Sequence, residues 1–322
     1  MGLLLAILFL LAGGSVVISF GRRVAAGVIA TTMGLGLPPL LTGVLMVGFT
    51  PETMLIAMVA SLASVEGVAI GVIVGGVMAA MALWMGLAVA KAQKEMTFAA
   101  APAAVLIVPV LAVLLFWGLA ADGELARVDG LALLMAFGTA VVFLLYLSRK
   151  GLEVKPVGPA AAAGDDKLPL SAKQSLGLLG MLVAGLAAGS VMLVYGVRYA
   201  TAVAGVSNTT VAMTLLALLP TAPHLWRPMP SDDRSGPKIT YGNIMAPIVT
   251  LFLLTGGVVA IICPFKVPQA AVTFYLPLCV LTVAFLASVL LFRKLPRWSG
   301  VVLLALYAWF VLSGWLFHFA AK

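Results

Sequence analysis

Charged residues are scarce in this chain. Of its 322 residues, 9% are Asp, Glu, Lys or Arg and 63% are hydrophobic, whereas water-soluble globular proteins carry about 25% charged and about 45–50% apolar residues. The mean hydropathy is +1.19. Nineteen basic and eleven acidic residues cannot cover the surface of a water-soluble protein of this length. The composition excludes a water-soluble enzyme and a disordered chain, and it predicts an integral membrane protein.

Clustered positive charge is also missing, although the formal net charge is +8. Binding of nucleic acid needs Lys and Arg gathered on one solvated face. Here they stand singly or in pairs between long apolar runs. We therefore expect no nucleic-acid partner, and membrane lipid as the surroundings of the chain.

Cysteine is nearly absent. Cys263 and Cys279 lie in or beside apolar runs and form no C-x-x-C pair, so we interpret both as small buried hydrophobic residues. The apolar segment 1–20 lacks the basic start of a signal peptide, because its first positive charges, Arg22 and Arg23, come after it. We expect this segment to be retained as a first membrane span.

Ten apolar runs are long enough to cross a bilayer, which takes about 20 residues of helix. They cover residues 2–20, 36–61, 67–90, 100–120, 130–148, 174–200, 205–226, 242–263, 270–292 and 299–319. The predicted fold is an all-α integral membrane protein of ten transmembrane helices. Residues 1–148 hold the first five spans, 149–173 form a cytoplasmic linker containing PVGPAAAAG, and 174–322 hold the last five.

The distribution of Lys and Arg between the loops predicts the orientation. With the amino terminus outside, fifteen of the nineteen basic residues lie on the inner side and four on the outer side. The four outer residues are Arg127, Arg198, Lys266 and Lys322. We expect a multi-pass protein of the plasma (inner) membrane with both termini outside the cytoplasm.

The two halves of the chain resemble each other in sequence. Residues 13–25 read GGSVVISFGRRVA and residues 188–200 read AGSVMLVYGVRYA, with six identities at an offset of 175. Further on, Pro51 pairs with Pro223 at an offset of 172. Because each half has five spans, the second repeat must be inverted relative to the first. Inverted repeats are typical of secondary transporters, whose binding site lies at the repeat interface.

The second and seventh spans are each interrupted by proline, which breaks a helix. A titratable side chain follows each proline directly: Glu52 after Pro51, and His224 after Pro223. Unwound backbone is tolerated at membrane depth where it lines a cavity or is buried in protein. Carbonyls and one side chain per repeat could therefore hold a cation, with Glu52 as the metal ligand.

Three further polar residues are candidate substrate-binding groups: Thr50, Thr221 and Asn243. Each also has a structural explanation. The two threonines could bend their helices through side-chain to backbone bonds, and Asn243 could cap the eighth span. Glu52 could be a hydrogen-bonded structural carboxyl group, and His224 could lie at the cytoplasmic mouth, bonded to a carbonyl.

At these positions the sequence resembles the calcium/cation antiporter superfamily, the sodium/calcium and cation/proton exchangers. Their repeats share a pattern close to G-[IV]-S-x-x-[IV]-x-G-x-T-x-x-A-x-G-T-S-x-P-E. The second copy matches at Gly205, Ser207, Thr214, Ala217 and Pro223, and the first at Gly36, Gly43, Pro51 and Glu52. The family's G-N-x-x-G-S-N helix is echoed by Gly242 with Asn243, and by Gly71 with Gly75. The resemblance implies two inverted repeats and cation exchange by alternating access.

The sequence departs from the family where calcium would bind. His224 stands where the resemblance implies a second carboxylate, and Gly76 and Pro247 stand where it implies Asn or Asp. Calcium takes six to eight oxygen ligands, so one carboxylate and one imidazole make a poor calcium site. We therefore expect the ligand to be a monovalent or divalent cation that one carboxylate and one imidazole can hold, and we expect no other cofactor.

The leading hypothesis is proton-coupled cation antiport, with Glu52 binding cation or proton in turn and His224 sharing the proton. The alternative is an intramembrane enzyme on the same scaffold, in which Glu52 and His224 act as a catalytic acid–base pair on a lipid or an apolar small molecule. A third interpretation is a degenerate exchanger that binds a substrate without transporting it. The sequence leaves monomer and homo-oligomer open.

Overall fold

The computed structural model is built almost entirely of helices. It describes residues 2–34, 50–65, 67–92, 96–98, 103–149, 172–221, 231–232, 236–239, 247–292 and 294–320. Helices occupy part or all of each of the ten predicted spans. Within the described ranges, five helical segments are long and apolar enough to cross a membrane, and four shorter apolar ones accompany them.

The first half contains helices α1, α3, α4, α5, α6 and α7 and one π-helical segment, η1. Their bounds are α1 (Gly2–Gly34), α3 (Pro51–Leu62), α4 (Val68–Met78), η1 (Ala79–Trp84), α5 (Met85–Lys91), α6 (Ala103–Leu119) and α7 (Arg127–Arg149). Since α4, η1 and α5 follow one another without a gap, they form one continuous helix. It matches the predicted span 67–90.

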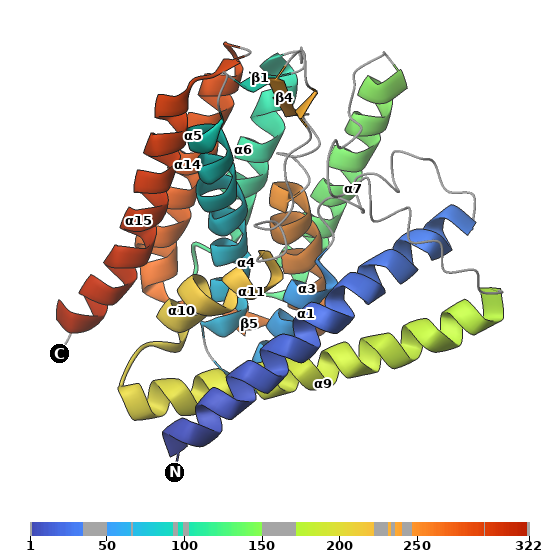
Figure 1. Cartoon of the computed structure of the whole chain (residues 1–322), viewed down its shortest axis with the longest axis vertical. Helices are drawn as coiled ribbons and strands as arrows, with labels where there is room; N and C mark the ends of the chain where they lie inside the picture. Colours follow the sequence, from blue (N-terminus) through green and yellow to red (C-terminus); the bar gives the residue numbers. More distant parts are fainter. Residues whose placement is uncertain are drawn as a thin grey trace.

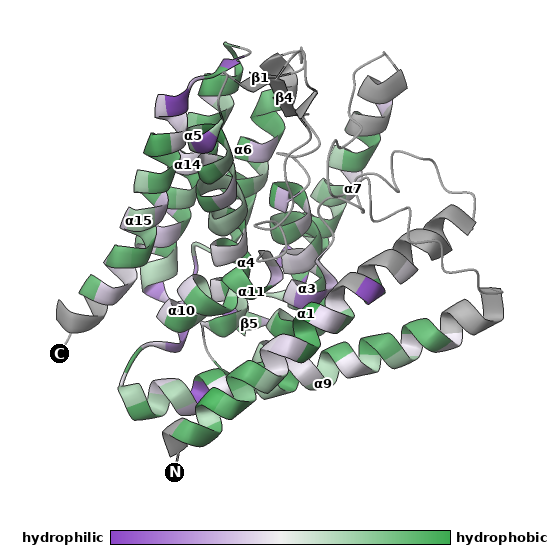
Figure 2. Ribbon diagram, in the orientation of Figure 1, coloured by the Kyte–Doolittle hydropathy of each residue, from purple (hydrophilic) through white to green (hydrophobic). Residues whose placement is uncertain are grey.

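The second half repeats this order. Its helices are α9 (Ala172–Ala204), α10 (Asn208–Val211), η2 (Ala212–Leu216), α11 (Leu218–Thr221), η4 (Thr250–Thr255), α13 (Gly256–Ile262), η5 (Ala271–Tyr275), α14 (Leu276–Leu290) and α15 (Arg297–Ala320). Apolar residues cover these helices along most of their length, as the colours of Figure 2 show. This is what a helix surrounded by lipid or by other apolar helices requires.

Short strands tie the helix connections together at both ends of the bundle. At one end β1 (Met96–Phe98) pairs with β6 (Lys294–Leu295) and with β4 (Gly236–Ile239), which in turn pairs with β3 (Ser231–Asp232). At the other end β2 (Glu124–Leu125) pairs with β5 (Phe265–Lys266). Both chain termini lie at the β5 end, opposite β1 and β4 (Figure 1).

Helices α1 and α9 form an antiparallel pair that runs obliquely past the other helices (Figure 1). Glycines allow the close approach of the two helices. A Cβ atom at Gly13 would lie 2.9 Å from the carbonyl oxygen of Gly189, and a Cβ at Gly189 would lie 2.7 Å from Cγ1 of Val16. Small residues at helix contacts are the usual means of packing helices in membranes.

Helix α4 lies at the centre of the bundle. Each of its eleven residues is buried, and the cluster of core side chains around it includes Ile70, Ile73 and Met78, all fully buried. A helix that is apolar on every side is buried on every side. This explains why the segment 68–78 carries no charged or hydroxyl side chain.

Paired features recur at a nearly constant separation along the chain. The π-helical segment η1 begins at Ala79 and η4 begins at Thr250, with the same offset that separates Gly71 from Gly242 in the sequence. The strand pairs β1–β6 and β5–β2 also correspond, because β5 follows β1 and β6 follows β2 at almost this offset. These features of the second half thus recur at the offset of the sequence repeat.

Two glycine–glycine helix crossings show the same separation. A Cβ at Gly300 in α15 would lie 2.8 Å from the Gly86 carbonyl oxygen in α5, and a Cβ at Gly130 in α7 would lie 2.8 Å from that of Gly257 in α13. Gly257 follows Gly86, and Gly300 follows Gly130, at nearly the offset of the π-helical segments. The same contact is therefore built twice, once in each half.

These crossings predict the effect of a single methyl group. Gly300→Ala places a Cβ 2.6 Å from the backbone nitrogen of Ala90, where neither helix backbone can yield, so we expect a loss of about 1–3 kcal/mol of stability. The measurement is the thermal unfolding midpoint in detergent. Gly257→Ala, which places its Cβ 3.1 Å from the Gly130 carbonyl oxygen, should lower the midpoint in the same way.

Gly138→Ala is the matched control, because nothing lies within 4 Å of a Cβ at that position of α7. Its midpoint should stay the same or rise slightly, since alanine favours a helix over glycine. Equal midpoints for Gly300→Ala and Gly138→Ala would contradict the close crossing.

Candidate functional site

Glu52 lies in the first turn of α3, which begins at the predicted break. Thr50 has non-helical backbone angles (φ −110°, ψ 83°), and Pro51 is the first helical residue. Proline suits this position because its fixed φ fits the helix and it has no N–H to leave unpaired. A carboxylate in the first turn is also favoured by the helix dipole. The sequence thus explains both the helix start and the place of Glu52.

The Glu52 carboxylate lies directly against helix α1. A Cβ atom at Gly21 would be 2.9 Å from Oε2 of Glu52 and 3.1 Å from its Cδ. The residue as a whole is half-buried, but Oε2 has almost no exposed surface. The absence of a side chain at Gly21 therefore makes the room in which the carboxylate sits.

Two threonines flank this carboxylate in the sequence. The hydroxyl oxygen of Thr50 is buried and has no hydrogen-bond partner among the residues that the structure describes. Thr53 is 2% exposed. The start of α3 thus brings a carboxylate and two hydroxyl groups close together along the chain, and all three are groups that bind hard cations through oxygen.

In the second half, the described part of the corresponding span ends at Thr221, the last residue of α11. Buried threonines line the helix before it: the Thr214 hydroxyl donates to the Thr210 carbonyl oxygen at 2.7 Å, and the Thr210 hydroxyl donates to that of Gly314 at 3.3 Å. His224 and Asn243 lie outside the described residues. The predicted pairing of Glu52 with His224 therefore stays a prediction.

The two halves meet where α4 contacts α10 and η2. A Cβ at Gly71 would lie 2.6 Å from Cβ of Ala212, and one at Gly75 would lie 2.5 Å from the Met213 carbonyl oxygen. The sequence had singled out Gly71 and Gly75, and the structure gives them a role in packing. A larger residue at either position would separate the third span from the seventh.

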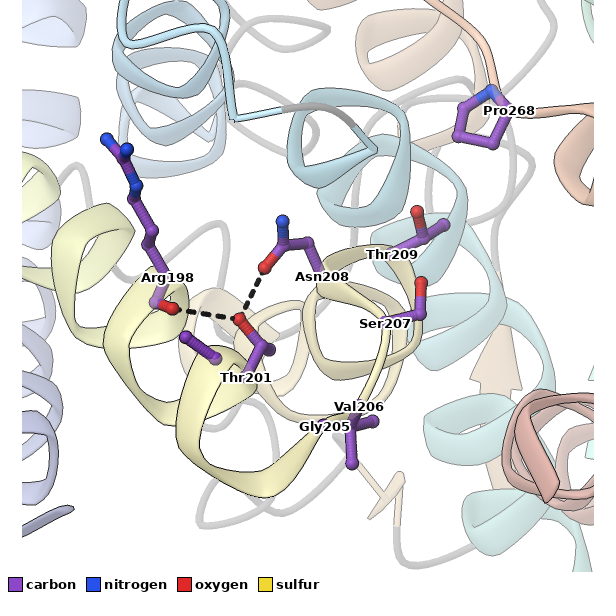
Figure 3. Close-up of a pocket in the computed structure, with 9 residues that line it drawn as sticks. Arg198, Thr201, Gly205, Val206, Ser207, Asn208, Thr209 and Pro268 are labelled. Atoms are coloured by element: carbon purple, nitrogen blue, oxygen red, sulfur yellow. Dashed lines mark hydrogen bonds between the residues drawn. The ribbon is translucent and has the colours of Figure 1, made fainter. Parts of the chain in front are cut away.

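A cavity of about 600 Å³ opens where α9 ends and α10 begins. Polar side chains and one proline form much of its lining: Arg198, Thr201, Ser207, Asn208, Thr209 and Pro268. Figure 3 shows these residues around the turn between the two helices. The sequence had placed Ser207 in the repeat motif, whereas Thr201 and Asn208 belong to no motif and were missed.

The turn that shapes this cavity is a glycine C-cap. Gly205 has a positive φ of 65°, and the Val206 N–H donates to the Thr201 carbonyl oxygen at 3.2 Å. This is the arrangement in which glycine commonly ends a helix. The Thr201 hydroxyl bonds to Asn208 Oδ1 at 2.5 Å and so links α9 to α10.

Among the described residues, no group of three His, Cys, Asp or Glu side chains is placed to hold a metal ion. Glu52 is an acidic residue within a described span, and its side chain packs against Gly21 of helix α1. Any cation bound here would need carbonyl and hydroxyl oxygens in addition to this carboxylate.

The family described as sodium/calcium exchanger protein matches residues 174–315 of the chain. A search of curated proteins finds no match. Among solved structures, the chain is similar to the sodium-calcium exchanger NCX_Mj, soaked with zero Na⁺ and Ca²⁺, at 18% identity and a TM-score of 0.55. The alignment covers 97% of this chain and 99% of that one.

The chain is also similar to the H⁺/Ca²⁺ exchanger CAX, at 16% identity and a TM-score of 0.64, over 98% of this chain and 88% of that one. At these identities the structural likeness establishes the fold. The second half of the chain, residues 174–315, thus matches the sodium/calcium exchanger family, and the chain as a whole shares the fold of these two exchangers.

Proposed function

We propose that this protein is a proton-coupled cation antiporter in which Glu52 binds a cation and a proton in turn. The observation that carries the proposal is the position of Glu52: a carboxylate in the first turn of α3, packed against Gly21 of a second helix, with Oε2 buried. The superfamily is one of cation exchangers, and the similar protein CAX is named as an H⁺/Ca²⁺ exchanger.

A bare carboxylate inside a membrane is costly, and this cost supplies the coupling. Glu52 can be neutralised by a proton or compensated by a cation. Release of one ligand therefore favours uptake of the other, which is the requirement for exchange. The unwound backbone at Thr50 adds oxygen ligands on the approach to the carboxylate.

The proposed architecture is ten transmembrane helices in two inverted five-helix repeats. The repeated π-helical segments, the two strand pairs at opposite ends and the two glycine crossings support it, because all recur at nearly the same offset along the chain. Inversion explains why β1–β6 and β2–β5 lie at opposite ends. In this arrangement the binding site lies where the two repeats meet.

The proposed location is the plasma (inner) membrane, with both termini outside the cytoplasm. The two termini lie at the same end of the bundle (Figure 1), as an even number of spans requires. The described loops with β1, β4 and β6 then face the cytoplasm. Basic residues of these loops include Lys238, Lys294 and Arg297, in accord with the positive-inside rule.

His224 is the proposed partner of Glu52, as a group that shares the proton, and Thr50, Thr221 and Asn243 are proposed ligands of the substrate. With a single carboxylate, the site would suit a monovalent or divalent cation that accepts few charged ligands. The enzyme alternative needs Glu52 and His224 within reach of one bridging water, and the described residues give it no separate support.

Glu52→Gln tests the proposal. It keeps the shape of the side chain but removes the charge and the titration, so cation-dependent proton flux should fall at least tenfold. The measurement is the pH change inside proteoliposomes that carry a pH gradient, after Na⁺, K⁺, Ca²⁺ or Mg²⁺ is added outside.

The control is Glu124→Gln, since Glu124 is an exposed residue of the β2–β5 strand pair outside the spans. Its flux should match that of the unmodified protein. Full flux in Glu52→Gln would show that another group carries the proton.

A second prediction follows from the contact between Gly21 and Glu52. Gly21→Ala places a methyl group 2.9 Å from Oε2, so the carboxylate must move away from its position. Because the displaced group is the end of a flexible side chain, we expect little change in thermal stability but a loss of about tenfold in cation affinity, or about 1.4 kcal/mol.

Gly14→Ala in the same helix is the matched control, since its Cβ would meet Leu219 at an ordinary 3.6 Å. The cation concentration for half-maximal flux should rise in Gly21→Ala and stay unchanged in Gly14→Ala. Equal values in the two variants would show that α1 does not shape the site.

A further inference from the structure

We infer that the cavity between α9 and α10 binds the oxyanion of a phosphate group. The site is separate from Glu52 and belongs to neither of the helix breaks. Its lining residues come from the end of α9, the turn 205–207, the start of α10 and Pro268. The inference stands apart from the proposed antiport, because it concerns another set of residues.

The charge of the cavity lining is positive. Among the residues that the structure describes, Arg198 is the one charged side chain in the lining. A guanidinium group presents several N–H donors in a planar fork that fits the oxygens of phosphate.

The side chain of Asn208, a lining residue of the cavity, is oriented by a hydrogen bond. Its Oδ1 is occupied by the bond with the Thr201 hydroxyl, so the amide Nδ2 points away from Thr201. Figure 3 shows this nitrogen on the same side as the extended Arg198 side chain. The bond to Thr201 thus orients a second N–H donor for an anion.

Ser207 adds a third donor, since its exposed hydroxyl lies in the same lining. The cavity volume, about 600 Å³, is within the range of small-ligand sites, roughly 300–1,000 Å³. Nearby residues of α9 are apolar and exposed: Tyr199 is 49% and Val203 57% exposed. The cavity therefore borders a lipid-facing surface, and the phosphate group could belong to an anionic phospholipid or be free in solution.

The test uses the full-length protein purified in detergent, with isothermal titration calorimetry of inorganic phosphate at constant ionic strength. A second arm reconstitutes the protein in nanodiscs with phosphatidylglycerol or phosphatidylcholine and measures retained lipid by native mass spectrometry. Arg198→Gln and Asn208→Asp should each weaken binding at least tenfold. Asn208→Asp keeps the acceptor for Thr201 and brings a negative charge, so its unfolding midpoint should be unchanged while anion binding is lost.

Arg127→Gln is the matched control, because Arg127 is an arginine at the start of α7, outside the cavity. Binding should be unchanged in this variant and in Glu52→Gln, which separates the anion site from the antiport site. Binding of phosphate alone identifies a free anion, and retention of phosphatidylglycerol alone identifies a lipid headgroup. Equal binding in Arg198→Gln and the unmodified protein, or no binding of either ligand to the folded protein, would overturn the inference.

Discussion

A charge inside the hydrocarbon of a membrane has no water to stabilise it, and the arrangement around Glu52 follows from this constraint. The carboxylate stands in the first turn of α3, where the helix dipole favours a negative charge, and its Oε2 is shielded by the close packing of α1. Gly21 is what permits the packing. Under the proposed function, this carboxylate binds a proton and a cation in turn.

The surrounding helices are positioned by close contacts between small residues. Gly71 and Gly75 bring α4 against the seventh span. The crossing of Gly86 with Gly300 joins α5 to α15, and the crossing of Gly130 with Gly257 joins α7 to α13. Hydrophobic burial cannot drive helix association within lipid, so packing of this kind must do so. Because these contacts occur once in each half, the two halves pack their helices in the same way.

Much of the helical layout could be predicted from the sequence, because runs of about 20 apolar residues have few alternatives in a bilayer. The start of α3 at Pro51 is as predicted, because proline has no N–H to donate and its fixed φ suits the first position of a helix. The family resemblance was carried by a few residues such as Gly205 and Thr214, and the similarity to exchangers confirms it.

Other features had no local signal. The π-helical segments η1 (AAMALW) and η4 (TLFLLT) contain no proline, glycine or charged residue that would mark them in the sequence. The strands β2 and β5 are two residues long, too short to show alternation. Neither the contact of Gly21 with Glu52 nor the bond of Thr201 to Asn208 follows from spacing, because each depends on how two helices meet. His224 and Asn243 lie outside the described residues, and their roles stay predictions.

The central claim is that cation and proton compete for one carboxylate. The most direct measurement is proton release from the purified protein in weakly buffered detergent solution, followed with a pH-indicator dye as Na⁺ or Ca²⁺ is added. The account predicts that binding of a cation releases protons, that the release saturates, and that it disappears at a pH where Glu52 is already ionised. Saturable cation binding without proton release at any pH would contradict it.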